Sequence, residues 1–347
     1  MNKKIVALAV AAAFAIPAAA SAQTTLFGQF KYEVGLIEAP AVADGGNGER
    51  NAVHSSIGTR LGVMGSEDLG GGMSAIFRFQ GSPGGANDPL SGKSWAFNEE
   101  NWVGLRGGFG TVQLGRSDTA FKKGHTRFRV FPDSLADLNN RPASFGRVEG
   151  VHYSSPNFGG ATINASLEPN GAELDTYWAL GVNYVAGPLF VGAAVESAPD
   201  TGTYGNTANR GGGPTIAADG TNWQVGASYK WNDLTVGLLY QDIDTNPAAP
   251  GLQLLGAAVP GTYITLPVTY NLGNVGLRAA IQHRDPDQAG LSSALNYALG
   301  ASYNFSSRTE AFVHLWYDDE RRAMVDPAPF GAAAEEVQFG LGLRHSF

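Results

Sequence analysis

Apolar and polar residues alternate with a period of two along most of the chain that follows residue 22. Leu26, Phe30 and Val34 fall on one face of the first such segment, and Gln29 and Lys31 fall on the other. The alternation returns in segments 57–63, 161–168, 223–230 and 275–282. Successive side chains of a β-strand point to opposite faces, so each segment predicts a strand with one apolar and one polar face.

Short and long connections between these segments follow one another in turn. The short ones carry turn residues such as Gly-Gly, Pro-Asn, Gly-Pro and Asn-Asp, and span 65–72, 106–111, 155–160, 185–188, 230–234, 271–274 and 304–308. The long ones are polar and span 38–53, 81–94, 117–147, 169–176, 197–222, 243–262, 284–294 and 318–335. Seven short and eight long connections separate sixteen predicted strands.

The strands of a soluble β-sandwich also alternate apolar and polar residues. Its connections, however, rarely keep a strict alternation of long and short lengths over so many strands. Sixteen antiparallel strands enclose a lumen too wide for side chains to fill, so the polar face has to meet water there. An apolar exterior then suits lipid, and closure leaves no unpaired edge. Aromatic residues near the short turns fit an interfacial girdle, namely Tyr153, Phe158, Tyr184, Trp231, Tyr270, Tyr303 and Phe305. The sequence predicts an all-β fold, a 16-stranded antiparallel transmembrane β-barrel.

Residues 1–22 have the composition of a secretory signal peptide. Lys3 and Lys4 precede an apolar stretch, and Ala20-Ser21-Ala22 forms an A-x-A cleavage site before Gln23. The alternative is an N-terminal membrane anchor, for which the apolar stretch is short. We expect cleavage after residue 22, which leaves residues 23–347 as one exported barrel domain.

Composition removes several other classes of protein. Of the 347 residues only 16% are charged and 47 are Gly, and the mean hydropathy of −0.11 excludes a bundle of membrane helices. The absence of Cys excludes disulfide scaffolds, thiolate metal sites and cysteine nucleophiles. The net charge of −8 argues against nucleic acid as a partner.

Five motifs resemble the trimeric general porins of the Gram-negative outer membrane, of the betaproteobacterial type. They are TRLGVMGSEDLGGG at 59–72, VGL followed by GGFGTV at 103–112, LGR at 114–116, YSSPNFGG at 153–160 and GLGLRHSF at 340–347. The resemblance implies an outer-membrane homotrimer that forms a water-filled channel for passive diffusion of ions and small hydrophilic solutes. It implies no cofactor, and its partners are outer-membrane lipids, lipopolysaccharide and the outer-membrane assembly machinery.

The last strand ends on an aromatic residue. Phe339, Leu341, Leu343 and Phe347 share one mostly apolar face. In the family such a strand closes the barrel against the first strand, and its terminal aromatic, here Phe347, is an assembly signal. The alternative is an ordinary terminal strand that happens to end in Phe.

The resemblance also implies a constriction loop, which folds into the barrel at the position of connection 117–147. Asp133 and Asp137 in its middle resemble the acidic side of the family's pore, and Arg60 matches the family's pore arginine. The remaining basic candidates are Lys31 and Arg78 on the polar faces of the wall, and Arg147 at the start of a predicted strand. Opposed fixed charges in a water-filled pore set its selectivity, although each residue could also be an ordinary solvated lumen residue.

Two departures from the family bear on selectivity. Glu100 stands where anion-selective relatives often carry basic residues, and the run around Arg147 is one residue short, which leaves the facing of Arg147 open. Without residues 1–22 the chain has 21 basic and 31 acidic residues, a net charge of −10. We therefore expect weak selectivity that leans to cations.

Other functions find less support in the sequence. A solute-specific channel with a binding site in the lumen would need inward aromatic residues, for which Trp102 and Tyr177 are candidates. A barrel enzyme could use His152 and Ser154, but no third group is evident to orient the imidazole. Neither a metal-binding spacing such as H-E-x-x-H nor a phosphate-binding loop occurs. We expect no enzyme, no metal and no cofactor.

Overall fold

The computed structural model describes residues 23–38, 50–55, 58–83, 95–97, 99–137, 144, 146–170, 175–198, 220–244, 260–287, 293–317 and 337–347. The predicted signal peptide 1–22 lies outside the described residues, and the first described strand begins at Gln23. Among the described helices, none is long and apolar enough to span a membrane.

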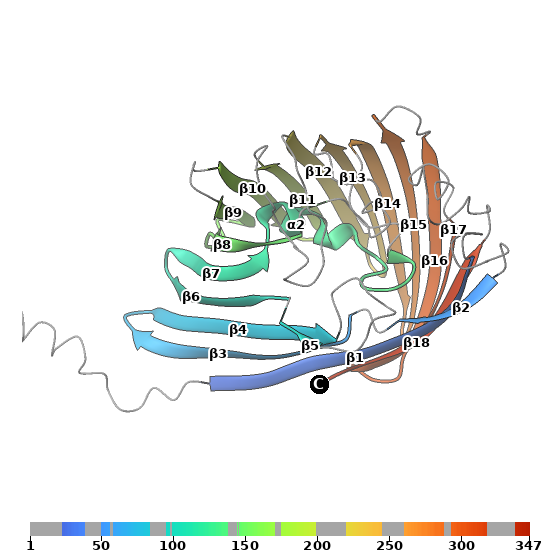
Figure 1. Cartoon of the computed structure of the whole chain (residues 1–347), viewed down its shortest axis with the longest axis horizontal. Coiled ribbons are helices and arrows are strands. Elements are labelled where there is room, and N and C mark those ends of the chain that lie inside the picture. Colours follow the sequence, from blue (N-terminus) through green and yellow to red (C-terminus); the bar gives the residue numbers. More distant parts are fainter. Residues whose placement is uncertain are drawn as a thin grey trace, which may run out of the picture.

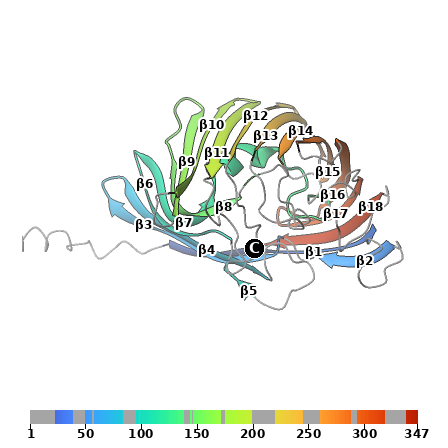
Figure 2. The ribbon, with the colours of Figure 1, turned by 45° about the horizontal axis from the view of Figure 1, so that its top comes forward.

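The strands form one closed antiparallel sheet around a lumen (Figures 1 and 2). β1 (Gln23–Glu38) pairs with β18 (Gln338–Ser346) from Gln29↔Ser346 to Leu36↔Phe339, which joins the two ends of the sheet. The strands between them are β3 (Arg60–Gly70), β4 (Met73–Pro83), β6 (Asn101–Gly107), β7 (Gly110–Asp118), β8 (Arg147–Ser154), β9 (Ala161–Asn170), β10 (Asp175–Ala186), β11 (Leu189–Ala198), β12 (Gly220–Trp231), β13 (Leu234–Ile243), β14 (Gly261–Leu272), β15 (Val275–Pro286), β16 (Ala294–Asn304) and β17 (Thr309–Tyr317). These sixteen wall strands confirm the predicted barrel.

Two further short strands lie in the same 18-stranded order. β2 (Arg50–Ser55) pairs with residues 33–38 of β1, while β3 pairs with residues 23–29 of β1. In the same way β5 (Trp95–Ala96) pairs with residues 82–83 of β4, and β6 pairs with residues 74–79 of β4. Each short strand therefore lies in line with a wall strand along a shared partner, β2 with β3 along β1 and β5 with β6 along β4. The sequence had assigned 50–53 to a connection, because so short a segment carries little alternation.

The outer face of the wall is apolar and carries aromatic residues in two rows. The exposed pairs Trp178 and Tyr184, Trp223 and Tyr229, and Tyr297 and Tyr303 are each six residues apart on one strand. At about 3.3 Å per residue, six residues span about 20 Å along a tilted strand. Aliphatic side chains such as Leu180 and Leu299 lie between the rows. This is an apolar belt between two aromatic girdles, the exterior of a transmembrane barrel.

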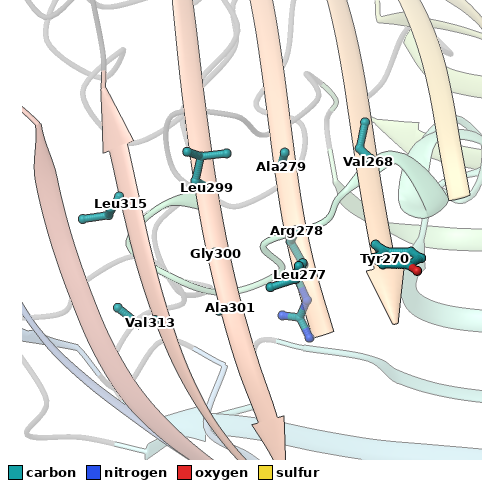
Figure 3. A pocket seen from close by; sticks show the side chains of 10 residues that line it. All are labelled: Val268, Tyr270, Leu277, Arg278, Ala279, Leu299, Gly300, Ala301, Val313 and Leu315. Atoms are coloured by element: carbon teal, nitrogen blue, oxygen red, sulfur yellow. The ribbon is translucent and has the colours of Figure 1, made fainter. Parts of the chain in front are cut away.

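A groove with a volume of 420 Å³ crosses the outer face of β14–β17 (Figure 3). It forms where the small side chains of Ala279 and Ala301 lie between the larger Leu277 and Leu299 of the same two strands. Its other side chains are also almost all apolar, and Val268, Val313 and Leu315 contribute to its walls. The groove is therefore part of the apolar belt.

Candidate functional site

Residues 119–137, the described stretch that follows β7, fold into the lumen (Figure 2). This stretch forms α2 (Ala120–His125) and the 3₁₀ turn η1 (Thr126–Phe128), then continues in irregular structure to Asp137. The side chain of Thr119 caps α2, because its hydroxyl accepts a hydrogen bond from the backbone N–H of Lys122 at 3.1 Å. This confirms an inward-folded loop at the predicted connection.

Three aromatic side chains of the loop pack on successive parts of the inner wall. Phe121 belongs to a buried cluster with residues of β8, β10, β11, β13 and β14. Phe128 packs on Phe190 of β11 and Leu239 of β13. Phe131 packs with Ala280, Ala298 and Trp316 of β15, β16 and β17. The loop therefore follows the wall from α2, which contacts β9–β12, towards β18 and β1.

The end of the described loop is held by charged residues, which we call the tip latch: Lys31, Arg60, Arg129, Asp133 and Asp137. Arg60 of β3 forms an ion pair with Asp133 of the loop. Arg129 forms an ion pair with Asp137, and its Nη2 also lies 3.4 Å from Oδ1 of Asp133. The backbone N–H of Asp133 donates a hydrogen bond to Oδ2 of Asp137 at 3.0 Å. Each carboxylate of the latch is thus matched by at least one guanidinium.

Backbone groups of the tip bind to β1. The ammonium group of Lys31 donates hydrogen bonds to the carbonyl oxygens of Pro132 at 3.1 Å and Asp133 at 2.6 Å. Glu33 accepts a hydrogen bond at Oε2 from the backbone N–H of Leu135 at 3.0 Å. Gly58, just ahead of β3, has a φ of +88°, and a Cβ there would lie 2.7 Å from Cβ of Asp133. A glycine at this position therefore makes room for the tip.

A second group of charged side chains lies on the wall from β4 to β8. We call it the wall cluster: Arg78, Glu99, Glu100, Asp118 and Arg147. Nε of Arg78 lies 3.4 Å from Oε2 of Glu100. Arg147 bridges Glu99 and Asp118, with Nη2 and Nε each 2.8 Å from a carboxylate oxygen. Asp118 also pairs with Lys122 of α2 at 2.7 Å. The cluster joins Glu99 and Glu100, just ahead of β6, to both ends of the loop.

Comparison with known proteins assigns the chain to a family. Residues 7–323 match the family model described as Gram-negative porin. The chain belongs to the Gram-negative porin family.

Among its curated relatives, this porin is 29% identical to outer membrane porin protein 32 of Delftia acidovorans and 26% identical to major outer membrane protein P.IB of Neisseria lactamica, each alignment covering 100% of both chains. Among solved structures it is similar to the anion-selective porin from Comamonas acidovorans, with a TM-score of 0.70, 23% identity and coverage of 94% of this chain and 100% of that one. OmpT of Vibrio cholerae gives a TM-score of 0.64 at 17% identity, with 96% and 100% covered. The porin is therefore an outer-membrane protein that forms a passive diffusion channel.

The structure brings the sequence-predicted pore residues into two separate groups. Asp133, Asp137, Arg60 and Lys31 meet in the tip latch, and Arg78, Glu100 and Arg147 belong to the wall cluster. The resemblance implied acids and bases that oppose one another across the pore. Asp133 instead contacts Arg60 directly, and Asp137 is only 4% exposed beside Arg129.

Five charged residues of this site in the porin are not predicted from the sequence, namely Arg129, Glu33, Glu99, Asp118 and Lys122. Arg129 precedes Asp133 by four residues and Asp137 by eight, and Asp118 precedes Lys122 by four, which is the spacing of side-chain pairs on a helical turn. That spacing was the available signal. The alternation places Glu33 on the polar face of its strand, beside Lys31, but nothing in the sequence indicated the partners of Glu33 and Glu99, which lie far along the chain.

Burial and charge act in opposite directions on the loop residue Arg129. Burial lowers the pKa of its guanidinium, but the carboxylates of Asp137 and Asp133 raise the pKa and outweigh burial. The guanidinium of Arg129 therefore keeps its positive charge at neutral pH. It is a permanent counter-ion for the two loop acids.

His152 of the porin does not pair with Ser154. Its Nδ1 lies 3.0 Å from Oγ of Ser166, and its Nε2 lies 3.2 Å from the carbonyl oxygen of Val148. Oγ of Ser166 also accepts a hydrogen bond from the backbone N–H of Ala120, so the pair positions the start of α2. Within the described ranges no three His, Cys, Asp or Glu side chains gather into a possible metal site.

Proposed function

We propose that residues 119–137 are the constriction of a general diffusion channel for ions and small hydrophilic solutes. The observation that supports this most is the path of the loop, whose described contacts lie along β8–β17 and at β1 and β3. The water path then runs between the loop and the wall cluster. Arg78, Glu100 and Arg147 border it directly, while Lys31, Arg60, Asp133 and Asp137 border it mainly by fixing the loop tip.

A solute-specific channel is disfavoured by the two aromatic candidates. Tyr177 is fully buried, and its hydroxyl donates a hydrogen bond to Glu196 at 2.7 Å. Nε1 of Trp102 donates to Oε2 of Glu100 at 3.3 Å. Both polar groups are thus already engaged within the wall rather than offered to a solute. The ring nitrogens of His152 are likewise engaged, with Ser166 and with the carbonyl oxygen of Val148. We therefore propose that the porin has no catalytic activity.

Liposome swelling with a graded series of neutral sugars and amino acids tests the general channel. The expected rates fall smoothly with solute size and do not depend on stereochemistry. A rate that saturates for one solute, or that distinguishes two stereoisomers of equal size, would establish a binding site in the lumen and overturn the proposal.

We also propose that the porin is a homotrimer, in which the outer faces of the first and last strands pack against neighbours. Large apolar side chains stand on these faces, with Leu26 and Phe30 of β1 62% and 65% exposed and Leu341 and Leu343 of β18 also exposed. Contiguous apolar surface of this kind marks an interface or a lipid contact. Native mass measurement of the unheated, detergent-extracted protein should give three chains. A monomer alone would contradict the trimer.

Lipids and the assembly machinery are the remaining partners that we propose. The 420 Å³ groove on β14–β17 suits the acyl chains of outer-membrane lipids. The headgroups of lipopolysaccharide would then lie beyond the aromatic row that is nearer to the long connections. The backbone of Phe347 exchanges hydrogen bonds with Gly28 of β1 at 3.0 and 3.1 Å, while its ring stays exposed. An exposed terminal ring supports its role as the assembly signal. Cleavage of residues 1–22 is testable from the mass of the exported chain.

A further inference from the structure

The constriction loop is a basic segment in an acidic protein. The chain carries a net charge of −8, but connection 119–146 holds five Lys or Arg and only two Asp. Its described part, 119–137, holds Lys122, Lys123, Arg127 and Arg129 against Asp133 and Asp137. The segment therefore carries a local excess of positive charge.

The two acids of the loop are already matched. Asp133 pairs with Arg60 and lies beside Arg129, and Asp137 pairs with Arg129 and is almost completely buried. Lys122 is matched as well, by Asp118. Among the described residues of the loop, the cations that remain are Lys123 and Arg127. Within the described part of the chain, no carboxylate lies within ion-pair distance of either one.

Lys123 and Arg127 are four residues apart and so lie on the same side of the α2–η1 turn. Nζ of Lys123 lies 3.5 Å from Oγ of Ser154, the last residue of β8. The guanidinium of Arg127 lies 4.6 Å from the ring centroid of Phe190, next to the start of β11, and its side chain is exposed. Both wall residues stand beside short turns, which are periplasmic in such barrels. The two cations therefore face the periplasmic half of the lumen.

Nearby acids reduce this charge without cancelling it. Asp118 and Glu100 act on Lys123 electrostatically, but Asp118 is shared by Lys122 and Arg147, and Glu100 lies beside Arg78. Arg127 faces an aromatic ring rather than a carboxylate. The Debye length is about 10 Å at 0.1 M salt, so both charges act on ions that leave the constriction.

We propose that Lys123 and Arg127 determine the ion preference of this porin and set it for small anions such as chloride. The loop then supplies the selective cations, and the acids of the loop serve to fix its tip. This replaces the lean to cations that Glu100 and the overall charge had suggested.

Reversal potentials in a potassium chloride gradient across planar bilayers test the proposal. The parental pore should prefer chloride at 0.1 M salt. Each charge removed, in Lys123→Gln or Arg127→Gln, should lower the chloride-to-potassium permeability ratio about two- to three-fold, and the double variant should show both effects. The conservative double variant Lys123→Arg with Arg127→Lys should keep the parental ratio.

Arg308→Gln is the matched control, because it removes one positive charge from the exposed turn between β16 and β17. Its permeability ratio should stay at the parental value. Unheated gel migration should show folded oligomer for every variant compared. A parental pore that prefers potassium would overturn the proposal, and so would a folded double Gln variant with the parental ratio.

Discussion

We expect the loop tip to depend on an aromatic anchor more than on the ion pairs of the tip latch, and both sides of one contact can test this. Phe131 packs into a buried cluster on β15–β17, with its ring 5.0 Å from that of His314. Phe131→Ala empties this site from the loop side. Gly300→Ala fills it from the wall side, because a Cβ there would lie 2.6 Å from Cε1 of Phe131 and 2.7 Å from Cδ2 of His314.

The magnitudes distinguish the anchor from the ion pair. Truncation of a buried Phe to Ala costs about 3–5 kcal/mol. Loss of a partly exposed ion pair such as Arg60–Asp133 costs about 1 kcal/mol or less. Since each 1.4 kcal/mol is a factor of about ten, Phe131→Ala should raise the population of a displaced tip on the order of 10²- to 10³-fold. Arg60→Ala should raise it less than about ten-fold.

Single-channel recording detects displacement of the loop tip as a change in open-channel noise and conductance. Phe131→Ala and Gly300→Ala should increase open-channel noise and raise the mean conductance, while Arg60→Ala should leave both near the parental values. Gly276→Ala is the control on β15, because the nearest atom to its Cβ would be the rotatable hydroxyl of Ser302. If folded Phe131→Ala and Gly300→Ala pores gave parental noise and conductance, the aromatic anchor would not hold the tip.

Three further predictions concern assembly and charge. Deletion of Phe347, which removes two backbone hydrogen bonds to Gly28, should lower the outer-membrane yield of heat-modifiable protein, and an unchanged yield would argue against an assembly signal. Glu100→Arg should shift the reversal potential towards anion selectivity and Arg60→Ala towards cation selectivity, and both shifts should shrink as salt rises. If neither variant shifted the reversal potential at low salt, neither residue would line the pore. Burial lowers the pKa of Lys123 below the ordinary 10.5 against the opposing charges of Asp118 and Glu100, so the parental anion preference should weaken as pH rises towards that value, and Lys123→Gln should lack this component.

The fold was predictable because it rests on local alternation. Each wall strand separates lipid from water, so its alternation alone predicts which side chains face outward. It predicts an outward side chain for Trp223 and Val225 and an inward one for Gln224, with no information on neighbouring strands. The two short strands were not predictable in the same way. β2 and β5 are too short to show a period, and they are strands only because β1 and β4 offer backbone partners.

The candidate site was predictable in its residue types and not in its pairings. The position of the loop and the identities of Arg60 and Asp133 came from the family resemblance. That these two residues touch depends on the packing of Phe131 and Leu135, which fixes the depth to which the tip crosses the lumen. Contacts of this kind join residues 73 positions apart, and no local pattern encodes them.

The pairing of β1 with β18 makes the wall a ring, and a ring has consequences for how the chain reaches its native state. Gln29 finds its partner at Ser346, so the final hydrogen-bonded contacts wait until the whole chain has been synthesised and exported. Folding dominated by contacts so distant in sequence is slow, and the open edges of an unfinished sheet can pair with other chains. Once the seam has closed, no edge remains from which unfolding can start in lipid. The pairing of β1 with β18 therefore makes both the folding and the unfolding of the barrel slow.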